Sequence, residues 1–149
     1  MSTSMSKTSE RSIVVTTDGS CLDLDVIHGF LTTSYWARGI PREAVARSME
    51  HSLCFGAFDG DRQVGFARVI SDRATFAYVC DVFALESDRG RGVGKSLMAA
   101  IMAHPELQGL RRWTLATSNA HGLYRQFGFG APAHSERQME VLDGAPYRA

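Results

Sequence analysis

The residues with the clearest chemical potential lie in one short segment, 88–96, which reads DRGRGVGKS. Its three glycines alternate with basic residues, and glycine lets the backbone adopt positive φ and approach a ligand closely. Apolar residues recur at helical spacing from Val93 onwards, so a helix is expected to begin inside the segment. Backbone N–H groups at a helix N-terminus bind anions, and the segment therefore predicts a phosphate-binding loop.

Two widespread phosphate-binding loops do not fit this segment. A P-loop would need its first glycine at the position of Arg89. A dinucleotide-binding fingerprint, GxGxxG, would need a third glycine at position 95 or 97, where the sequence has lysine and leucine. A nucleotide-dependent phosphotransferase is therefore the weaker interpretation of the loop.

The segment does match the pattern Arg-x-x-Gly-x-Gly, carried by Arg89, Gly92 and Gly94, directly after an apolar strand. A second motif lies nearer the C-terminus, where an alanine is followed by a Leu-Tyr pair and then by a Gly-Phe pair. Its residues are Ala120, Leu123, Tyr124, Phe127, Gly128 and Phe129. Together with the order of elements over residues 12–142, the two motifs resemble the GNAT superfamily of acyl-CoA-dependent N-acetyltransferases.

The resemblance implies acetyl-CoA as the acyl donor, with its pyrophosphate held by the loop amides. The helix dipole favours an anion there, and basic side chains add charge-assisted hydrogen bonds. The strand before the loop is expected to pair its backbone with the pantetheine arm, as an added strand would. The implied coenzyme-binding residues are Phe83, Ala84, Arg89, Gly90, Arg91, Gly92, Val93, Gly94 and Lys95.

Two qualifications apply to this coenzyme site. For Arg91 and Lys95, a solvated surface charge is an equally good interpretation, because exposed charges are common and individually weak. Thr117 stands where many relatives carry an asparagine, so a coenzyme contact made through that asparagine is not carried over to this chain.

Acetyl transfer to an amine poses two proton problems. The amine must be neutral to attack, and the coenzyme thiolate must be protonated as it leaves. The resemblance places Tyr124 near the thioester sulfur as the general acid, and a phenol with a pKa of about 10 can supply that proton. The alternative interpretation is a tyrosine that only packs in the core.

Asp81 is the one carboxylate in the apolar stretch 75–85, where a buried charge is costly unless it is paired. We interpret it as a catalytic residue that accepts the proton of the amine, directly or through water, or binds the cationic substrate. The alternative is a structural pair with Arg68, Arg73 or a backbone donor. Cys80 is expected to point to the opposite face of the strand, into the core, and not to carry an acyl group.

The acceptor site is expected to draw on residues outside this strand. The resemblance places the joint between the first two helices over the acceptor, so Tyr35 and Trp36 would form an aromatic wall there or else pack in the core. His121, one helical turn before Tyr124, is a second candidate base and substrate contact.

Hydrophobic periodicity predicts an α/β domain with hairpins first and crossovers later. The resemblance adds a GNAT fold, in which a mixed, mostly antiparallel central sheet is splayed at the acetyl-CoA site and flanked by helices. The expected strands cover residues 12–17, 53–58, 63–70, 75–85, 113–116 and 138–142. The expected helices cover residues 24–36, 41–52, 93–103 and 120–127.

Length and composition fit one globular domain over residues 12–149, preceded by a flexible N-terminal tail over residues 1–11. The chain has 149 residues, 44% of them hydrophobic and 21% charged, with zero formal net charge. The zero charge argues against nucleic acid as a partner, and no segment has the length of a membrane span. Three cysteines without CxxC spacing favour a reducing, cytoplasmic location, and five scattered histidines predict no metal site.

We therefore expect an acetyl-CoA-dependent N-acetyltransferase that acts directly on an amine of a small molecule or peptide. The alternative is a non-catalytic module that binds or senses acyl-CoA. The sequence leaves open the acceptor, the general base, the use of longer acyl groups and the oligomeric state, a homodimer included.

Overall fold

The structure, a computed structural model, describes residues 12–147, so the tail predicted over residues 1–11 lies outside the described residues. The strands are β1 (Val14–Thr16), β2 (Leu53–Asp59), β3 (Arg62–Ser71), β4 (Phe76–Ala84) and β5 (Arg112–Leu115). The α-helices are α2 (Leu24–Leu31), α3 (Arg42–Glu50), α4 (Val93–Ala103) and α5 (His121–Arg125). Short 3-10 helices are η1 (Gly19–Cys21), η2 (Glu86–Asp88), η3 (Pro105–Leu107) and η4 (Ser135–Arg137).

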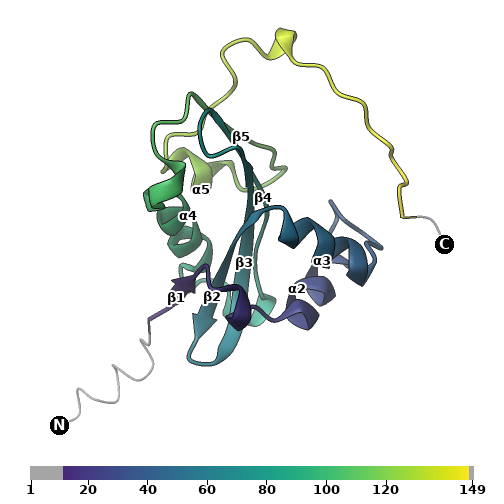
Figure 1. Ribbon diagram of the computed structural model, residues 1–149, viewed down its shortest axis with the longest axis vertical. Coiled ribbons are helices and arrows are strands. Elements are labelled where there is room, and N and C mark those ends of the chain that lie inside the picture. The colour runs from purple at the N-terminus through teal and green to yellow at the C-terminus, as the bar shows by residue number, and fades with distance from the viewer. Residues whose placement is uncertain (1–11, 148–149) are drawn as a thin grey trace.

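The five strands form one sheet in the order β1-β2-β3-β4-β5. Neighbouring strands are antiparallel except β4 and β5, which are parallel and are connected through α4. Helices α4 and α5 lie on one side of the sheet, and α2 and α3 lie on the other (Figure 1). This arrangement confirms the predicted α/β fold with a mostly antiparallel sheet flanked by helices.

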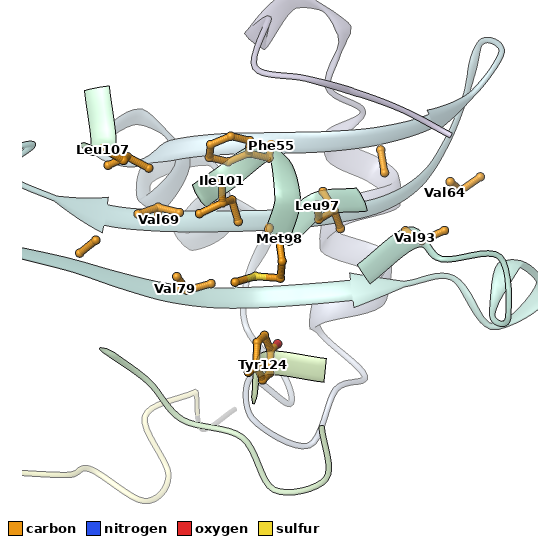
Figure 2. Packing of buried hydrophobic residues seen from close by; sticks show 13 residues of the cluster. Phe55, Val64, Val69, Val79, Val93, Leu97, Met98, Ile101, Leu107 and Tyr124 are labelled. Carbon is orange, nitrogen blue, oxygen red and sulfur yellow. The ribbon is translucent and has the colours of Figure 1, made fainter. Parts of the chain in front are cut away.

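The larger core lies between α4 and the sheet. Leu97, Met98 and Ile101 of α4 pack against Phe55 and Val79 of the strands, and all five side chains are almost fully buried (Figure 2). Burying a side chain of this size contributes about 1.5–3 kcal/mol to stability. The smaller core, on the opposite face, joins the helices α2 and α3 to the same sheet. Its buried residues are Ile27, Leu31, Val45, Cys54, Phe66 and Phe83.

The first helix is shorter than predicted, because α2 ends at Leu31 and not near Trp36. The hydroxyl of Thr33 donates to the carbonyl of Phe30, and the hydroxyl of Ser34 donates to the carbonyl of Leu31. Such local side-chain bonds offer the backbone an alternative to further helical turns. The aromatic residues that follow are therefore presented from a loop.

The prediction of a strand over residues 138–142 is wrong. This segment forms no strand, and after η4 it runs away from the sheet, as the yellow end of the ribbon in Figure 1 shows. The alternation of apolar and polar residues that predicted a strand is not sufficient to form one. A strand also needs a neighbour with which to exchange backbone hydrogen bonds, and the segment has none within residues 12–147.

Close packing of α4 against the sheet makes Gly65 of β3 a sensitive position. A Cβ at Gly65 would lie 2.5 Å from Cγ1 of Val93 and 2.8 Å from the backbone oxygen of Phe83. Because neither neighbour can move without disturbing the core, Gly65→Ala is expected to lower the free energy of unfolding by about 1–3 kcal/mol in urea denaturation.

Gly29→Ala provides the control, since Gly29 lies within α2 and a Cβ at this position would meet no atom within 4 Å. It is expected to leave the free energy of unfolding unchanged or raise it by up to about 1 kcal/mol. Equal stability of the two variants would contradict the packing described for Gly65.

Candidate active site

Strands β4 and β5 separate part of the way along the sheet. Their pairing runs from Phe76 with Arg112 to Val79 with Leu115 and stops there. Residues 80–84 of β4 remain paired with β3 on one side only, and the chain after β5 turns towards α5. The free edge of β4 therefore faces a gap in the sheet, which agrees with the predicted splaying of the sheet.

A groove of about 1160 Å³ occupies this gap. It is lined by β4 from Tyr78 to Ala84, by α2 and the loop after it, by Arg89, by residues 116–120 and by Tyr124. The amide of Leu85 donates to the carbonyl of Val64 on β3, at 2.8 Å. Since neighbouring amides in a strand point to opposite sides, the amide of Ala84 points away from β3 and towards the groove.

A β-bulge lies where the groove meets β4. Arg68 of β3 pairs with Cys80 and Phe66 pairs with Phe83, so β4 contains one residue more than β3 in this interval. Asp81 lies in this bulge and has a φ of 55°, in the left-handed region. A non-glycine residue is uncommon in that region, and strained residues of this kind cluster at active sites and ligand contacts.

The bulge corrects the expectation that Cys80 and Asp81 point to opposite faces. Cys80 lies opposite Arg68, and the Arg68 side chain reaches Asp81, so all three lie on the α2 face of the sheet. Both Cys80 and Asp81 line the groove. Burial raises the pKa of Cys80 to about 12, so its thiol is protonated at neutral pH and a poor nucleophile.

Two side chains hold the carboxylate of Asp81. The Nε of Arg68 donates to Oδ2 at 2.9 Å, and the Nε1 of Trp36 donates to Oδ1 at 2.9 Å. Arg68 is itself fixed by Ser52, whose hydroxyl accepts from Nη1 at 3.0 Å. The structural ion pair that was the alternative interpretation of Asp81 is therefore present, and Arg68 is its cation. A carboxylate offers about four acceptor positions, so Asp81 can still accept from a ligand.

Tyr124 lies in the same groove as Asp81, but it comes from α5. Its side chain is buried, with 8% of the residue exposed. Burial, with a smaller effect of Tyr35, raises the pKa of Tyr124 above the usual value of a phenol. The hydroxyl is therefore protonated at neutral pH, which is the form that a proton donor requires.

The loop after α2 brings two aromatic residues to the groove. Tyr35 and Trp36 are 58% and 42% exposed, and their rings meet edge to face with centroids 5.0 Å apart. The hydroxyl of Tyr35 accepts from the amide of Ser118 across the groove, at 3.4 Å. These residues form a wall of the groove and do not pack in the core.

His121 is not brought to this groove. It begins α5 and lines a second groove of about 780 Å³, which runs beside β5. Tyr124 borders both grooves. Of the two candidate bases, only Asp81 lines the cavity between β4 and α5.

The glycine-rich loop has the backbone geometry of an anion site. Gly90 and Gly92 have φ values of 82° and 75°, and no atom lies within 4 Å of a Cβ built on either residue. The first hydrogen bond of α4 runs from the amide of Ser96 to the carbonyl of Gly92. The amides of residues 93–95 precede that bond, and no side chain caps them.

The side chain of Arg91 forms ion pairs with two aspartates of the same chain. Its Nη1 donates to Asp88 at 2.8 Å and to Asp59 at 3.1 Å, while Arg62 donates through both terminal nitrogens to Asp88 at 2.9 Å. This charge cluster of Asp59, Arg62, Asp88 and Arg91 fastens the loop to the turn between β2 and β3. Arg91 thus acts as a loop anchor, and the phosphate contact expected from its side chain stays a prediction.

Arg89 and Lys95 are exposed, and Arg89 borders the groove. Within residues 12–147, neither side chain has an ion pair with a carboxylate. Arg89 is therefore available to a phosphate at the groove, while Lys95 is an exposed cation in the first turn of α4.

Sequence reasoning missed two aromatic residues of the groove. The ring of Phe30 stacks on Phe83 with centroids 4.0 Å apart, and Tyr78 lies two residues before Cys80 on the same face of β4. The period of two in the strand could have identified Tyr78. Phe30 resembles any apolar residue of an amphipathic helix and gave no separate signal.

Neither a metal centre nor a membrane span is found in the part of the chain that the structure describes. No group of three or more histidine, cysteine, aspartate or glutamate side chains over residues 12–147 could hold a metal ion. No helix in the same range has the length and apolarity needed to cross a bilayer.

Comparison with known proteins gives evidence that does not depend on this geometry. The family model of the acetyltransferase (GNAT) domain matches residues 50–130, which contain β4, the glycine-rich loop and Tyr124. A crystal structure from Xanthomonas campestris pv. campestris, described as an inferred acetyltransferase of the GNAT family, superimposes with a TM-score of 0.90. It is 53% identical and covers 93% of this chain and 98% of its own.

Two curated relatives are also similar. A protein of Gibberella zeae, described as an inferred acetyltransferase, is 29% identical over 88% of this chain and 84% of its own length. Serotonin N-acetyltransferase 2 of Oryza sativa subsp. japonica, a chloroplastic protein, is 32% identical over 80% of this chain. The match spans 64% of that rice protein, just under two thirds of its length.

The charge cluster predicts how acid affects stability. Hydrogen bonds from Arg62, with help from Arg91, lower the pKa of buried Asp88 to about 2, against about 3.9 for an unfolded aspartate. Its stabilising contribution is complete above about pH 4 and is lost as the pH falls towards 2. Asp88→Asn is expected to lower the free energy of unfolding by about 1.5–3 kcal/mol at pH 7 and to flatten its decline between pH 4 and 2.

Asp25→Asn is the matched control, because Asp25 forms an exposed ion pair with Arg42. Its loss is expected to cost less than about 1 kcal/mol. If Asp88→Asn and wild type lost stability in parallel between pH 4 and 2, Asp88 would not be the titrating anchor.

Proposed function

Since the chain belongs to the GNAT acetyltransferase family, we propose that it is an acetyl-CoA-dependent N-acetyltransferase acting on a small molecule or peptide. It transfers the acetyl group directly to an amine. One observation carries this proposal: a single groove along the free edge of β4 joins Arg89 to Tyr124 and Asp81. A phosphate-binding end, a proton donor and a carboxylate thus share one cavity.

The residues of the groove fit acetyl-CoA in charge and in hydrogen bonding. The open glycines and the free amides at the start of α4 suit the pyrophosphate, and Arg89 and Lys95 add positive charge. The amide of Ala84, on the free edge of β4, suits the amide-bearing pantetheine arm. Phe83 lies beside it, but its ring is buried against Phe30 and, by the same alternation, its backbone groups point towards β3, so Ala84 is the proposed backbone contact. When bound, the coenzyme supplies an activated thioester.

Tyr124 and Asp81 are assigned the two proton transfers. Tyr124 donates its phenolic proton to the departing thiolate, a role that its raised pKa and its burial support. Asp81 accepts a hydrogen bond from the acceptor amine and takes its proton, directly or through a water molecule. Arg68 and Trp36 hold the carboxylate in place for this step.

The acceptor end of the groove favours an amine with an aromatic or aliphatic body. Tyr35, Trp36 and Tyr78 provide aromatic surface, and Asp81 provides the negative charge that attracts an ammonium group. The name of the rice relative, serotonin N-acetyltransferase, supports placing aromatic monoamines in the first set of acceptors to be assayed. Peptide N-termini and aliphatic diamines complete that set.

Tyr124→Phe tests the proposed mechanism in a thiol-release assay with acetyl-CoA and this set of amines. The substitution removes one oxygen and keeps the ring, so packing is retained. General acid catalysis is worth about 10²–10⁴-fold, so kcat is expected to fall by that factor while KM for acetyl-CoA changes little. A wild-type kcat in the variant would remove Tyr124 from the mechanism.

Gly92→Val separates loss of coenzyme binding from loss of chemistry in the same assay. Gly92 has a φ of 75°, which a valine adopts only with strain, so the substitution is expected to distort the loop proposed to hold the phosphate. KM for acetyl-CoA is expected to rise at least tenfold. Gly109→Val, at a φ of 74° between η3 and β5, imposes similar strain away from the groove and is expected to leave KM unchanged. Coenzyme binding without thiol release on any amine would identify a non-catalytic acyl-CoA module.

A further inference from the structure

The sheet extends beyond the helices that cover it on the α2 side. Helices α2 and α3 pack against Cys54, Phe66 and Phe83, with which they form the smaller core. Farther along β3 and β4, the side chains of Ile70 and Phe76 are 42% and 37% exposed. Figure 1 shows the turn between β3 and β4 well beyond α2 and α3. The outer end of this hairpin therefore presents apolar side chains to solvent.

These apolar side chains share a face of the sheet with the candidate active site. Phe76 precedes Tyr78 by two residues, Ile70 pairs with Tyr78 across the two strands, and Tyr78 itself lines the groove between β4 and α5. Because side chains alternate along a strand, Ala77 and Val79 point to the other face, where both are buried in the larger core. Ile70, Phe76 and Tyr78 thus form one apolar strip that continues the groove.

Charge is placed at the two ends of this apolar strip. At the inner end lies the carboxylate of Asp81, which Arg68 and Trp36 hold in place. The residues of β4 between Phe76 and Asp81 carry no charge. At the outer end, Arg112 of β5 pairs with Phe76, and within residues 12–147 its side chain has no ion pair with a carboxylate. One ammonium group therefore finds a counter-charge at Asp81, whereas a second one farther along the strip would meet only positive charge.

The apolar strip is too long for a small amine to cover. A strand rises about 3.3 Å per residue, so Phe76 lies about 13 Å from Cys80, which directly precedes Asp81. A compact amine held at Asp81 would leave Ile70 and Phe76 in water. Because the gain from burying apolar surface is roughly proportional to its area, an acceptor whose chain reaches Phe76 would bind more tightly.

We propose that the acceptor is a primary monoamine with an extended apolar chain. Its ammonium group binds Asp81, and its chain lies along Tyr78, Ile70 and Phe76. These three side chains then determine specificity, because neither a short amine nor a diamine complements both ends of the strip. The inference rests on the proposed function, since it takes Asp81 as the residue that contacts the acceptor amine.

A series of straight-chain amines tests the apolar strip in the thiol-release assay. Ethylamine, butylamine, hexylamine, octylamine and decylamine carry the same amino group and differ only in chain length. Each buried methylene is worth about two- to fourfold, so kcat/KM is expected to rise through the series. The diamine with the carbon chain of octylamine is expected to be about tenfold poorer than octylamine, because its second ammonium group loses water without gaining a partner. Equal kcat/KM along the series, or a diamine as good as octylamine, would overturn the proposal.

Variants of the strip test whether its side chains cause this dependence. Combining Ile70→Thr with Phe76→Thr removes apolar surface and keeps residue types that are compatible with a strand at one or both positions. The ratio of kcat/KM for decylamine to kcat/KM for butylamine is expected to fall by about tenfold or more. Val14→Thr is the control, because Val14 is 59% exposed on β1 at the far edge of the sheet, and this variant is expected to keep the wild-type ratio. An unchanged ratio in the double variant would contradict the proposal.

Calorimetry separates this inference from the proposed function, because it measures binding of the same amines without turnover. Affinity that rises with chain length, without thiol release from any amine, would contradict the proposed function and support the apolar strip. Turnover with equal kcat/KM and equal affinity along the series would overturn this inference alone. Light scattering of the double variant covers the remaining occupant of the strip. A changed oligomeric state, with an unchanged dependence on chain length, would assign the strip to contact between two copies of the chain and overturn the proposal.

Discussion

The separation of β4 from β5 after Val79 is the constraint on which the rest of the site depends. A fully paired sheet would use the polar backbone groups of β4 internally and leave no room for a ligand between the strands. Because the pairing stops, one edge of β4 is open while β3 still holds the other. The bulge at Asp81 lies next to this point and aims a carboxylate into the opening, where Arg68 and Trp36 fix it.

The two ends of the groove are positioned by different interactions. The glycine-rich loop is flexible by composition, and the charge cluster of Asp59, Arg62, Asp88 and Arg91 ties it to the turn between β2 and β3. Tyr124 is positioned by packing, since a Cβ at Gly94 on α4 would lie 3.2 Å from Leu123 on α5. The first turn of α4 therefore contacts the helix that carries the proposed acid.

Local patterns in the sequence predicted much of this arrangement. Apolar residues on both faces of β4 predicted a central strand, and the glycines before a helical repeat predicted the loop that precedes α4. The bulge could not be predicted, because Asp81 is not a glycine and strict alternation placed Cys80 on the wrong face. The anchoring of Arg91 and the failure of residues 138–142 to form a strand share one cause. Both depend on which groups distant in the chain lie within reach, and periodicity does not reveal this.

Hydrogen exchange of backbone amides with and without acetyl-CoA tests the central claim most directly. If the coenzyme lies along the free edge of β4, the amide of Ala84 and the amides of residues 92–95 should exchange more slowly when it is bound. Amides along the outer edge of β5 should be unaffected by the coenzyme. Protection along β5, with none at Ala84 and the start of α4, would contradict the assignment of the groove.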